Sequence, residues 1–173
     1  PSPLLPTLHA TYLLAACGTQ AADALLAEIA GGRAATLALT NRRGAWDGAA
    51  SDVSLSGGKL NGTAWYVQDA RKAELFVVAA LENGQAGLYL VRAGAAGMDI
   101  NAASIVALTR DQAHIRFEGV AVESVLAPAG AAADAIRAAE PALLTLIAAD
   151  MCGAGEWQLQ TTAEYARVRQ QFD

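Results

Sequence analysis

Apolar positions recur at helical spacing near both ends of the chain. Thr7 and Thr19 are good N-cap residues, and glycines follow the apolar segment after each of them, so the sequence predicts helices over 8–17 and 20–30. The helical pattern returns from residue 134 and continues to the last residue. Helices are therefore expected on both sides of the middle of the chain.

The middle of the chain instead shows strand-like patterns. Apolar residues alternate with serines around Val53, and the dipeptides Asn61-Gly62 and Asn83-Gly84 favour two-residue hairpin turns. Strands are expected at 35–40, 53–55, 63–68, 74–81, 87–92, 104–109 and 114–122. Short strands joined by tight turns are typical of antiparallel sheets. We therefore predict an α+β fold, with an antiparallel β-barrel or sandwich flanked by N-terminal helices and a long C-terminal helix.

We expect three parts along the chain: a helical segment over 1–33, a middle β domain over 34–130 and a long helix over 131–173. The last helical pattern reaches residue 173 without the Gly, Asn or Pro that usually closes a helix. This pattern predicts that more protein follows. The alternative is a natural C-terminal helix that frays.

The composition narrows the class of protein. The 173 residues are 54% hydrophobic and 17% charged, with a net charge of −5, which excludes intrinsic disorder. The 12 Lys and Arg residues are scattered, so no nucleic-acid partner is expected, and no apolar run reaches the roughly 18 residues of a membrane span. Cys17 and Cys152 are too few for a disulfide scaffold or a zinc site. With no signal-peptide pattern, we expect a cytoplasmic protein.

Motifs for self-contained catalysis or nucleotide binding are missing from the sequence. It contains no Gly-x-Gly-x-x-Gly, no Walker-type phosphate loop and no Gly-x-Ser-x-Gly elbow. His9 and His114 stand alone, and an isolated histidine is more often a satisfied surface or core residue than a ligand or base. The carboxylates form no paired acid–base pattern. The residues alone therefore indicate a binding or scaffold domain.

Several short strings occur in the order and spacing of one known family and cover nearly the whole chain. The most specific is the last, over residues 165–172, which is similar to the pattern Y-A-x-x-R-x-Q-F. The others are Gly18-Thr19-Gln20, residues 26–32, Ala38-Leu39-Thr40, Leu60-Asn61-Gly62-Thr63, Val67 with Asp69-Ala70, residues 73–80, residues 88–91 and Thr109-Arg110. Together they resemble the acyl-CoA dehydrogenase family. The resemblance implies that the chain holds the end of an N-terminal helical domain, the whole middle β domain and the first helix of a C-terminal bundle.

The resemblance also implies a flavoprotein oxidoreductase of fatty acid metabolism, with FAD as cofactor and an acyl-CoA as substrate. In the family a carboxylate takes the α-proton of the acyl group and the flavin takes the β-hydride. The flavin would lie along Leu39 and Thr40 at a strand end and against two strand positions that match Tyr66 and Gln68. Gln68 departs from the usual Thr or Ser. The alternatives are an ordinary strand end and ordinary sheet aromatics.

Arg169, with Gln170 and Gln171, matches family residues that reach the FAD of an adjacent subunit. A guanidinium can form two hydrogen bonds with a pyrophosphate. The alternative is a solvent-facing helix arginine. The resemblance thus implies a homo-oligomer, or a heteromer with a paralogous subunit. We expect the chain alone to retain no FAD, because half of the pocket walls would be missing.

Three departures from the family pattern keep a second function open. Residues 41–48 replace the family's E-P-G-x-G-S-D loop, which cradles flavin and CoA. The helix around Leu144 is apolar, and Glu140 lies about one turn too early for a catalytic base; we expect it to cap a helix with Pro141 in its first turn. The family's usual catalytic Glu would lie beyond residue 173. The first function is a fragment of an FAD-dependent acyl-CoA dehydrogenase, inactive alone, and the alternative is a non-catalytic scaffold subunit of a heteromeric dehydrogenase.

Overall fold

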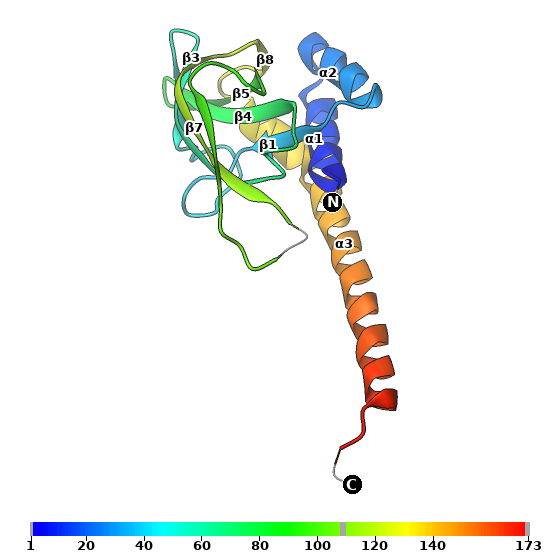
Figure 1. Cartoon of the computed structure of the whole chain (residues 1–173). Coiled ribbons are helices and arrows are strands. Elements are labelled where there is room, and N and C mark those ends of the chain that lie inside the picture. The colour runs from blue at the N-terminus through cyan, green and yellow to red at the C-terminus, as the bar shows by residue number, and fades with distance from the viewer. Residues whose placement is uncertain (1, 108–109, 172–173) are drawn as a thin grey trace.

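The computed structural model describes residues 2–107 and 110–171 of the chain. Two N-terminal helices lie beside a sheet of eight strands, and one long helix starts next to them and extends well beyond them (Figure 1). The elements are α1 Leu4–Cys17, α2 Gln20–Ala30, β1 Ala35–Ala38, β2 Val53–Ser56, β3 Lys59–Gln68, β4 Leu75–Glu82, β5 Gln85–Arg92, β6 Met98–Ala102, β7 Gln112–Ala121, β8 Ser124–Ala127 and α3 Ala132–Val168. The predicted α+β fold class is confirmed.

Most neighbouring strands of the sheet are antiparallel, in the order β6-β7-β3-β2-β4-β5-β8. The sheet is not closed, because β6 and β8 do not pair in the described part of the chain, and it is therefore a sandwich rather than a barrel. β1 pairs in parallel with β4, and β2 meets β4 in parallel at one residue pair. The chain passes from β1 to β4 through the β2–β3 hairpin. No helical crossover of the Rossmann type connects these parallel strands.

Both faces of β4 are buried, and its alternate residues belong to two separate cores. Leu75, Val77 and Ala79 pack in one core with apolar residues of α1, α2 and the start of α3. Phe76 and Val78, between them, pack in the other core with residues of β2, β3 and β7. Side chains of a strand alternate between the two faces, so a continuous apolar run can supply both cores at once. β4 thereby joins the helical layer to the sandwich.

The turn predicted at Asn61-Gly62 is wrong, because these residues lie inside β3. The β2–β3 hairpin turns instead at Gly57-Gly58, whose φ angles of 56° and 74° suit a two-residue turn that needs positive φ at both positions. Asn83-Gly84 does form the predicted turn, between β4 and β5, with φ angles of 52° and 78°.

Asn61 and Gly62 instead mark an irregularity in the pairing of β3 with β7. The side-chain Oδ1 of Asn61 accepts a hydrogen bond from the backbone N–H of Gly119 at 2.9 Å. Gly62 has a φ of 125°, and a Cβ on it would lie 2.1 Å from the carbonyl oxygen of Asp52. The dipeptide is therefore needed for close backbone approach within the sheet, which explains why a turn signal occurs in a strand.

Two other sequence predictions are corrected by the structure. No strand exists over 104–107, and residues 108 and 109 lie outside the described residues. β7 pairs with β3 on one side and with β6 on the other, and β6 comes earlier than the predicted strand and is mostly exposed. The first helix begins at Leu4, so Thr7 is not its N-cap. Thr19, in contrast, caps α2 as predicted, because its hydroxyl accepts a hydrogen bond from the N–H of Ala22.

The long helix α3 begins at Ala132, close to where the helical pattern of the sequence begins. Residues 132–139 are rich in alanine, which has the highest helix propensity, and they are helical. Pro141 therefore lies inside the helix, and Glu140 is not a cap as predicted. Within the described residues, none of the helices has an apolar stretch long enough to cross a bilayer.

Candidate functional site

A cavity of about 170 Å³ lies where β1, β3, α1 and α3 meet. Figure 1 shows β1 beside α1 and the first half of α3. The lining of the cavity is mostly apolar and contains no carboxylate. The lining residues are Pro6, His9, Thr36, Leu37, Leu39, Thr40, Trp46, Tyr66, Gln68, Leu143 and Ile147. Four residues that the sequence analysis singled out, Leu39, Thr40, Tyr66 and Gln68, are therefore brought to one cavity although they come from two segments of the chain.

The strand ends form one wall of this cavity. Leu39 and Thr40 directly follow β1, and Leu39 is buried. The carbonyl oxygen of Thr40 accepts a hydrogen bond of 2.9 Å from the backbone N–H of Trp65 in β3. This bond holds the end of β1 beside β3, so the residues after Trp65 lie next to Leu39 and Thr40.

Tyr66 reaches the cavity through a bulge in β3. The register of β3 against β7 shifts between Ala64 and Val67, and Tyr66 has a φ of 55°, which is unfavourable for an aromatic residue. Its N–H donates to Nδ1 of His114 at 3.4 Å, and its hydroxyl donates to the carbonyl oxygen of Arg42 at 3.2 Å. The bulge turns the ring out of the core, and the residue is 42% exposed. Backbone strain of this kind occurs most often at functional sites.

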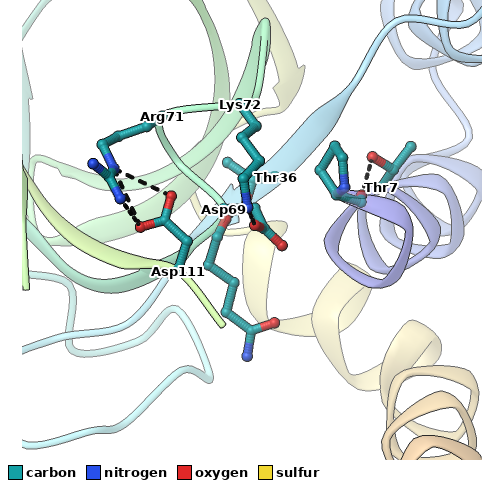
Figure 2. A network of polar contacts seen from close by, with 8 residues as sticks. Thr7, Thr36, Asp69, Arg71, Lys72 and Asp111 are labelled. Atoms are coloured by element: carbon teal, nitrogen blue, oxygen red, sulfur yellow. Dashed lines mark hydrogen bonds and ion pairs between the residues drawn. The ribbon is translucent and has the colours of Figure 1, made fainter. Parts of the chain in front are cut away.

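The backbone at Gln68 is held by a polar network, which Figure 2 shows around the β3–β4 turn. The hydroxyl of Thr36 donates to the carbonyl oxygen of Gln68 at 2.6 Å. The next residue, Asp69, donates its N–H to the carbonyl of Asp111 at 2.9 Å and forms an ion pair with Lys72. Arg71 donates from Nε and Nη2 to the carboxylate of Asp111. Gln68 therefore lies on a rigid turn at the rim of the cavity.

Two polar side chains at the cavity are available to a ligand. Within the described residues, neither the hydroxyl of Thr40 nor the side-chain amide of Gln68 has a hydrogen-bond partner. A hydroxyl can donate or accept, and an amide offers both a donor and an acceptor. The wall is thus apolar at Leu39 and Tyr66 and can form hydrogen bonds at Thr40 and Gln68.

His9 is a cavity residue whose environment the sequence analysis did not predict. It belongs to α1, is 8% exposed, and its Nε2 has no hydrogen-bond partner among the described residues. Burial lowers the pKa of His9, against a smaller opposite effect from the backbone of Leu143. The ring is therefore neutral at pH 7. The signal in the sequence was weak, because an isolated histidine near apolar helix residues has no pattern of its own.

The remaining sequence-predicted residues lie elsewhere. Glu140 is exposed and faces a separate pocket with Trp46 and Asp47. Arg169, Gln170 and Gln171 follow the far end of α3 and are exposed. The guanidinium of Arg169 lies 5.2 Å from the centre of the Tyr165 ring and donates to its hydroxyl. This chain therefore does not bring these three residues to the cavity. Thr109 and Phe172, from the sequence resemblance, lie outside the described residues.

The loop over 41–48 holds its own shape. The side-chain oxygen of Asn41 accepts hydrogen bonds from the N–H groups of Arg43 and Ala45, both at 3.0 Å. Arg42 stacks over the ring of Trp65, at 5.6 Å from its centroid. Asn41 thus closes the loop upon itself, and the loop presents Arg42 and Arg43 to solvent. The described side chains include no cluster of three or more His, Cys, Asp or Glu that could hold a metal ion.

No protein-family model and no curated protein sequence matches this chain. Solved structures do match it. The electron transferring flavoprotein structure of Acidaminococcus fermentans is 24% identical with a TM-score of 0.83, over 98% of this chain and 49% of that one. A steroid ACAD is 29% identical with a TM-score of 0.76, over 99% of this chain and 47% of its own. Butyryl-CoA dehydrogenase of Megasphaera elsdenii is 19% identical with a TM-score of 0.82, over 98% and 49%.

The chain therefore has the fold of the acyl-CoA dehydrogenases, and the resemblance seen in the sequence is confirmed in three dimensions. The chain spans about half the length of these structures. The fold places the cavity, but the activity of the whole protein is a separate question.

Proposed function

We propose that this chain supplies part of the flavin and acyl-CoA pocket of an FAD-dependent acyl-CoA dehydrogenase, which oxidises the α,β-bond of an acyl thioester. The observation that carries the proposal is the meeting of Leu39, Thr40, Tyr66 and Gln68 at one cavity. The sequence resemblance selected these residues independently of the structure. The likeness to solved acyl-CoA dehydrogenases over nearly the whole chain supports the same function.

The residues of the cavity wall would suit one side of a flavin ring. A flavin needs a flat apolar wall, which Leu39 and the Tyr66 ring would provide, and hydrogen-bond partners at its polar edge, which the Thr40 hydroxyl and the Gln68 amide would provide. When bound, FAD would accept the hydride from the substrate. Arg169, Gln170 and Gln171 would contact the FAD of a neighbouring subunit, because the far end of α3 carries them away from this cavity (Figure 1).

The same proposal accounts for the exposed second half of α3. Leu144, Met151 and Trp157 are 49%, 66% and 66% exposed, although they are large and apolar. We propose that further helices, of the same protein or of another subunit, cover them, with α3 as the first helix of a C-terminal domain and residues 34–130 as the β domain. A homo-oligomer or a heteromer in the cytoplasm would both fit this arrangement.

A second candidate function is a non-catalytic scaffold subunit of a heteromeric dehydrogenase. One observation favours it: Asn41 closes the loop that takes the place of the family's flavin-cradling loop. Glu140, the one carboxylate considered for catalysis, faces another pocket. A subunit of this kind could still contribute Arg169 to the cofactor of its partner.

Absorbance of the purified complete protein separates the two candidates. An active dehydrogenase should be isolated yellow, with about one flavin per subunit, and the flavin should be bleached by acyl-CoA under anaerobic conditions. A scaffold subunit should be isolated colourless and should acquire flavin only with a partner subunit. The chain of 173 residues alone should retain no FAD. Stoichiometric flavin in this short chain would contradict the prediction that the pocket is incomplete.

Substitution of Tyr66 tests the site itself. Tyr66→Ala in the complete protein should lower flavin occupancy at least several-fold, because it removes the ring that would lie against the cofactor. Tyr12→Ala is the matched control, since Tyr12 is similarly exposed at 46% but does not line the cavity. Equal loss of flavin in both variants, or no loss in either, would rule out the assigned wall.

A further inference from the structure

The imidazole of His9 carries a buried polar atom in the lining of the cavity. The side chain is more than nine-tenths buried, and Nε2 has no hydrogen-bond partner among the described residues. Its neighbours in the lining include Pro6, Leu143 and Ile147, which offer no side-chain polar group. An apolar side chain would fill this place at lower cost, since a buried polar atom without a partner is destabilising.

The charge state of His9 limits what could pair with it. Because burial lowers the pKa of His9, the ring is neutral at pH 7 and carries one N–H and one lone pair. A neutral imidazole does not select an anion. An uncharged hydroxyl suits Nε2 in either tautomer, because a hydroxyl can donate or accept a hydrogen bond.

The size of the cavity limits the ligand further. Its volume is about 170 Å³, close to the roughly 150 Å³ of an apolar protein cavity that takes up benzene. The part of the pocket that this chain forms therefore has room for a ligand group of about benzene's size beside His9. A ligand group of this size that is apolar apart from one hydroxyl could pair this hydroxyl with Nε2 of His9. Nε2 would then no longer be unpaired.

We propose that His9 is a specificity-determining residue of this cavity and pairs through Nε2 with an uncharged hydroxyl on an otherwise apolar ligand group. This inference rests on the proposed function for the identity of the ligand, which would be the acyl part of a hydroxylated acyl thioester. An unsubstituted saturated acyl group would bind with Nε2 still unpaired. The hydroxylated acyl group would be selected in two ways: it would form a hydrogen bond with Nε2, and the unsubstituted group would carry the penalty of leaving Nε2 unpaired.

The first experiment needs neither flavin nor CoA. Phenol and toluene have nearly the same shape, and differ by a hydroxyl in place of a methyl group. Their affinities for the chain should be measured by calorimetry in the wild type, His9→Leu and His9→Gln. The ratio of phenol to toluene affinity should be about tenfold higher in the wild type than in His9→Leu, and His9→Gln should restore part of it. Taking the ratio removes the difference in hydration between the two probes.

A second measurement distinguishes ligand recognition from a structural role. Without ligand, His9→Leu should unfold at the same or a higher temperature than the wild type, because it removes an unpaired polar atom. A clear fall in the unfolding temperature of His9→Leu, or a phenol-to-toluene ratio unchanged by the substitution, would overturn the inference. If only a water molecule pairs with Nε2, the phenol-to-toluene ratio should be the same in the wild type and in His9→Leu. The inference would fail in that case as well.

The third experiment uses the complete protein with its flavin and is chosen to separate the two proposals. Octanoyl-CoA and its 3-, 5- and 7-hydroxy derivatives are compared as substrates by kcat/KM. At least one hydroxylated substrate should be preferred about tenfold over octanoyl-CoA, and His9→Leu should abolish that preference, measured as the ratio of the two kcat/KM values within each variant. If turnover occurs without any such preference, the inference fails and the proposed function stands. If no thioester is oxidised but the phenol preference depends on His9, the proposed function fails and the role of His9 stands.

Discussion

The two halves of α3 have the same backbone structure and very different surroundings. All the buried residues of the helix lie between Ala132 and Leu143, where it packs against α1 and the helical face of the sheet. Residues 148–171 are exposed throughout. An unpacked helix is only marginally stable in water, and this half contains Gly153 and Gly155, which weaken it further. The contrast shows that the first half is held by tertiary packing, whereas the second half has no such packing among the described residues.

Two adjacent leucines give the sharpest test of this contrast. Leu143 is 1% exposed and Leu144 is 49% exposed. Leu143→Ala should cost about 2–5 kcal/mol of unfolding free energy, because it leaves a hole in the core, whereas Leu144→Ala should change it by less than about 0.5 kcal/mol. Urea unfolding of the chain measures both. Equal effects of the two substitutions would show that the two side chains are packed alike, against the burial described for Leu143.

Two glycines should respond in opposite directions. Gly62→Ala should cost more than about 2 kcal/mol, because a φ of 125° is strained for alanine and the new Cβ would lie 2.1 Å from the carbonyl oxygen of Asp52. Gly153→Ala should instead increase helix content and stability by about 0.5–1 kcal/mol, since nothing lies within 4 Å of the new Cβ. Circular dichroism during thermal unfolding reports both changes. A destabilised Gly153→Ala variant would show that the distal helix is packed at that position.

Ion pairs in the packed part of the protein should affect the free energy of unfolding more than polar contacts on the exposed half of α3. Arg92 donates to both carboxylate oxygens of Glu28, at 2.8 and 2.9 Å, and this bond lowers the pKa of Glu28 below its ordinary value of 4.5. A lowered folded-state pKa stabilises the protein above the ordinary value, and that stability is lost as the pH falls below it. Unfolding midpoints between about pH 6 and 3 should therefore fall less in Glu28→Gln than in the wild type.

Glu156→Gln in the exposed half of α3 is the control for this effect. Glu156 accepts a hydrogen bond from Gln160, one turn along the same helix, and has no ion-pair partner among the described residues. The pH dependence of this variant should follow that of the wild type. If Glu156→Gln flattened the curve as much as Glu28→Gln, the pair with Arg92 would not explain the pH dependence.

The two cysteines give the mildest test, since it leaves the fold intact. Burial raises the pKa of Cys17, on α1, to about 11, so little thiolate is present at pH 8. Cys152 is exposed on the distal half of α3. Alkylation by iodoacetamide, followed by mass spectrometry, should modify Cys152 on the order of ten times faster than Cys17. Cys17→Ser and Cys152→Ser assign each rate, and comparable rates would indicate that α1 is not packed as described.

Most elements could be predicted from the sequence because their signals are local. Thr19 before an apolar segment predicted α2, and Asn83-Gly84 predicted the β4–β5 turn. The errors occurred where contacts between distant segments changed the meaning of a local signal. Asn61-Gly62 reads as a turn, but Gly119 and Asp52, which are distant in sequence, make it part of a strand. Glu140 and Pro141 were expected to open a helix, but they lie inside α3, after its alanine-rich start.

Some residues of the cavity could be predicted because their signals, too, are local to the sequence. Leu39, Thr40, Tyr66 and Gln68 carry the pattern of a family, so the sequence identified them before their contacts were known. His9 carries no pattern, because an isolated histidine gains its meaning only from what surrounds it. The sequence by itself determined that helices flank a middle region of short strands, since periodicity, caps and turn dipeptides act over a few residues. Only the tertiary structure decided that Nε2 of an imidazole on α1 is buried at the cavity with no partner among the described residues, because burial and hydrogen bonding depend on segments that approach each other only when the chain is folded.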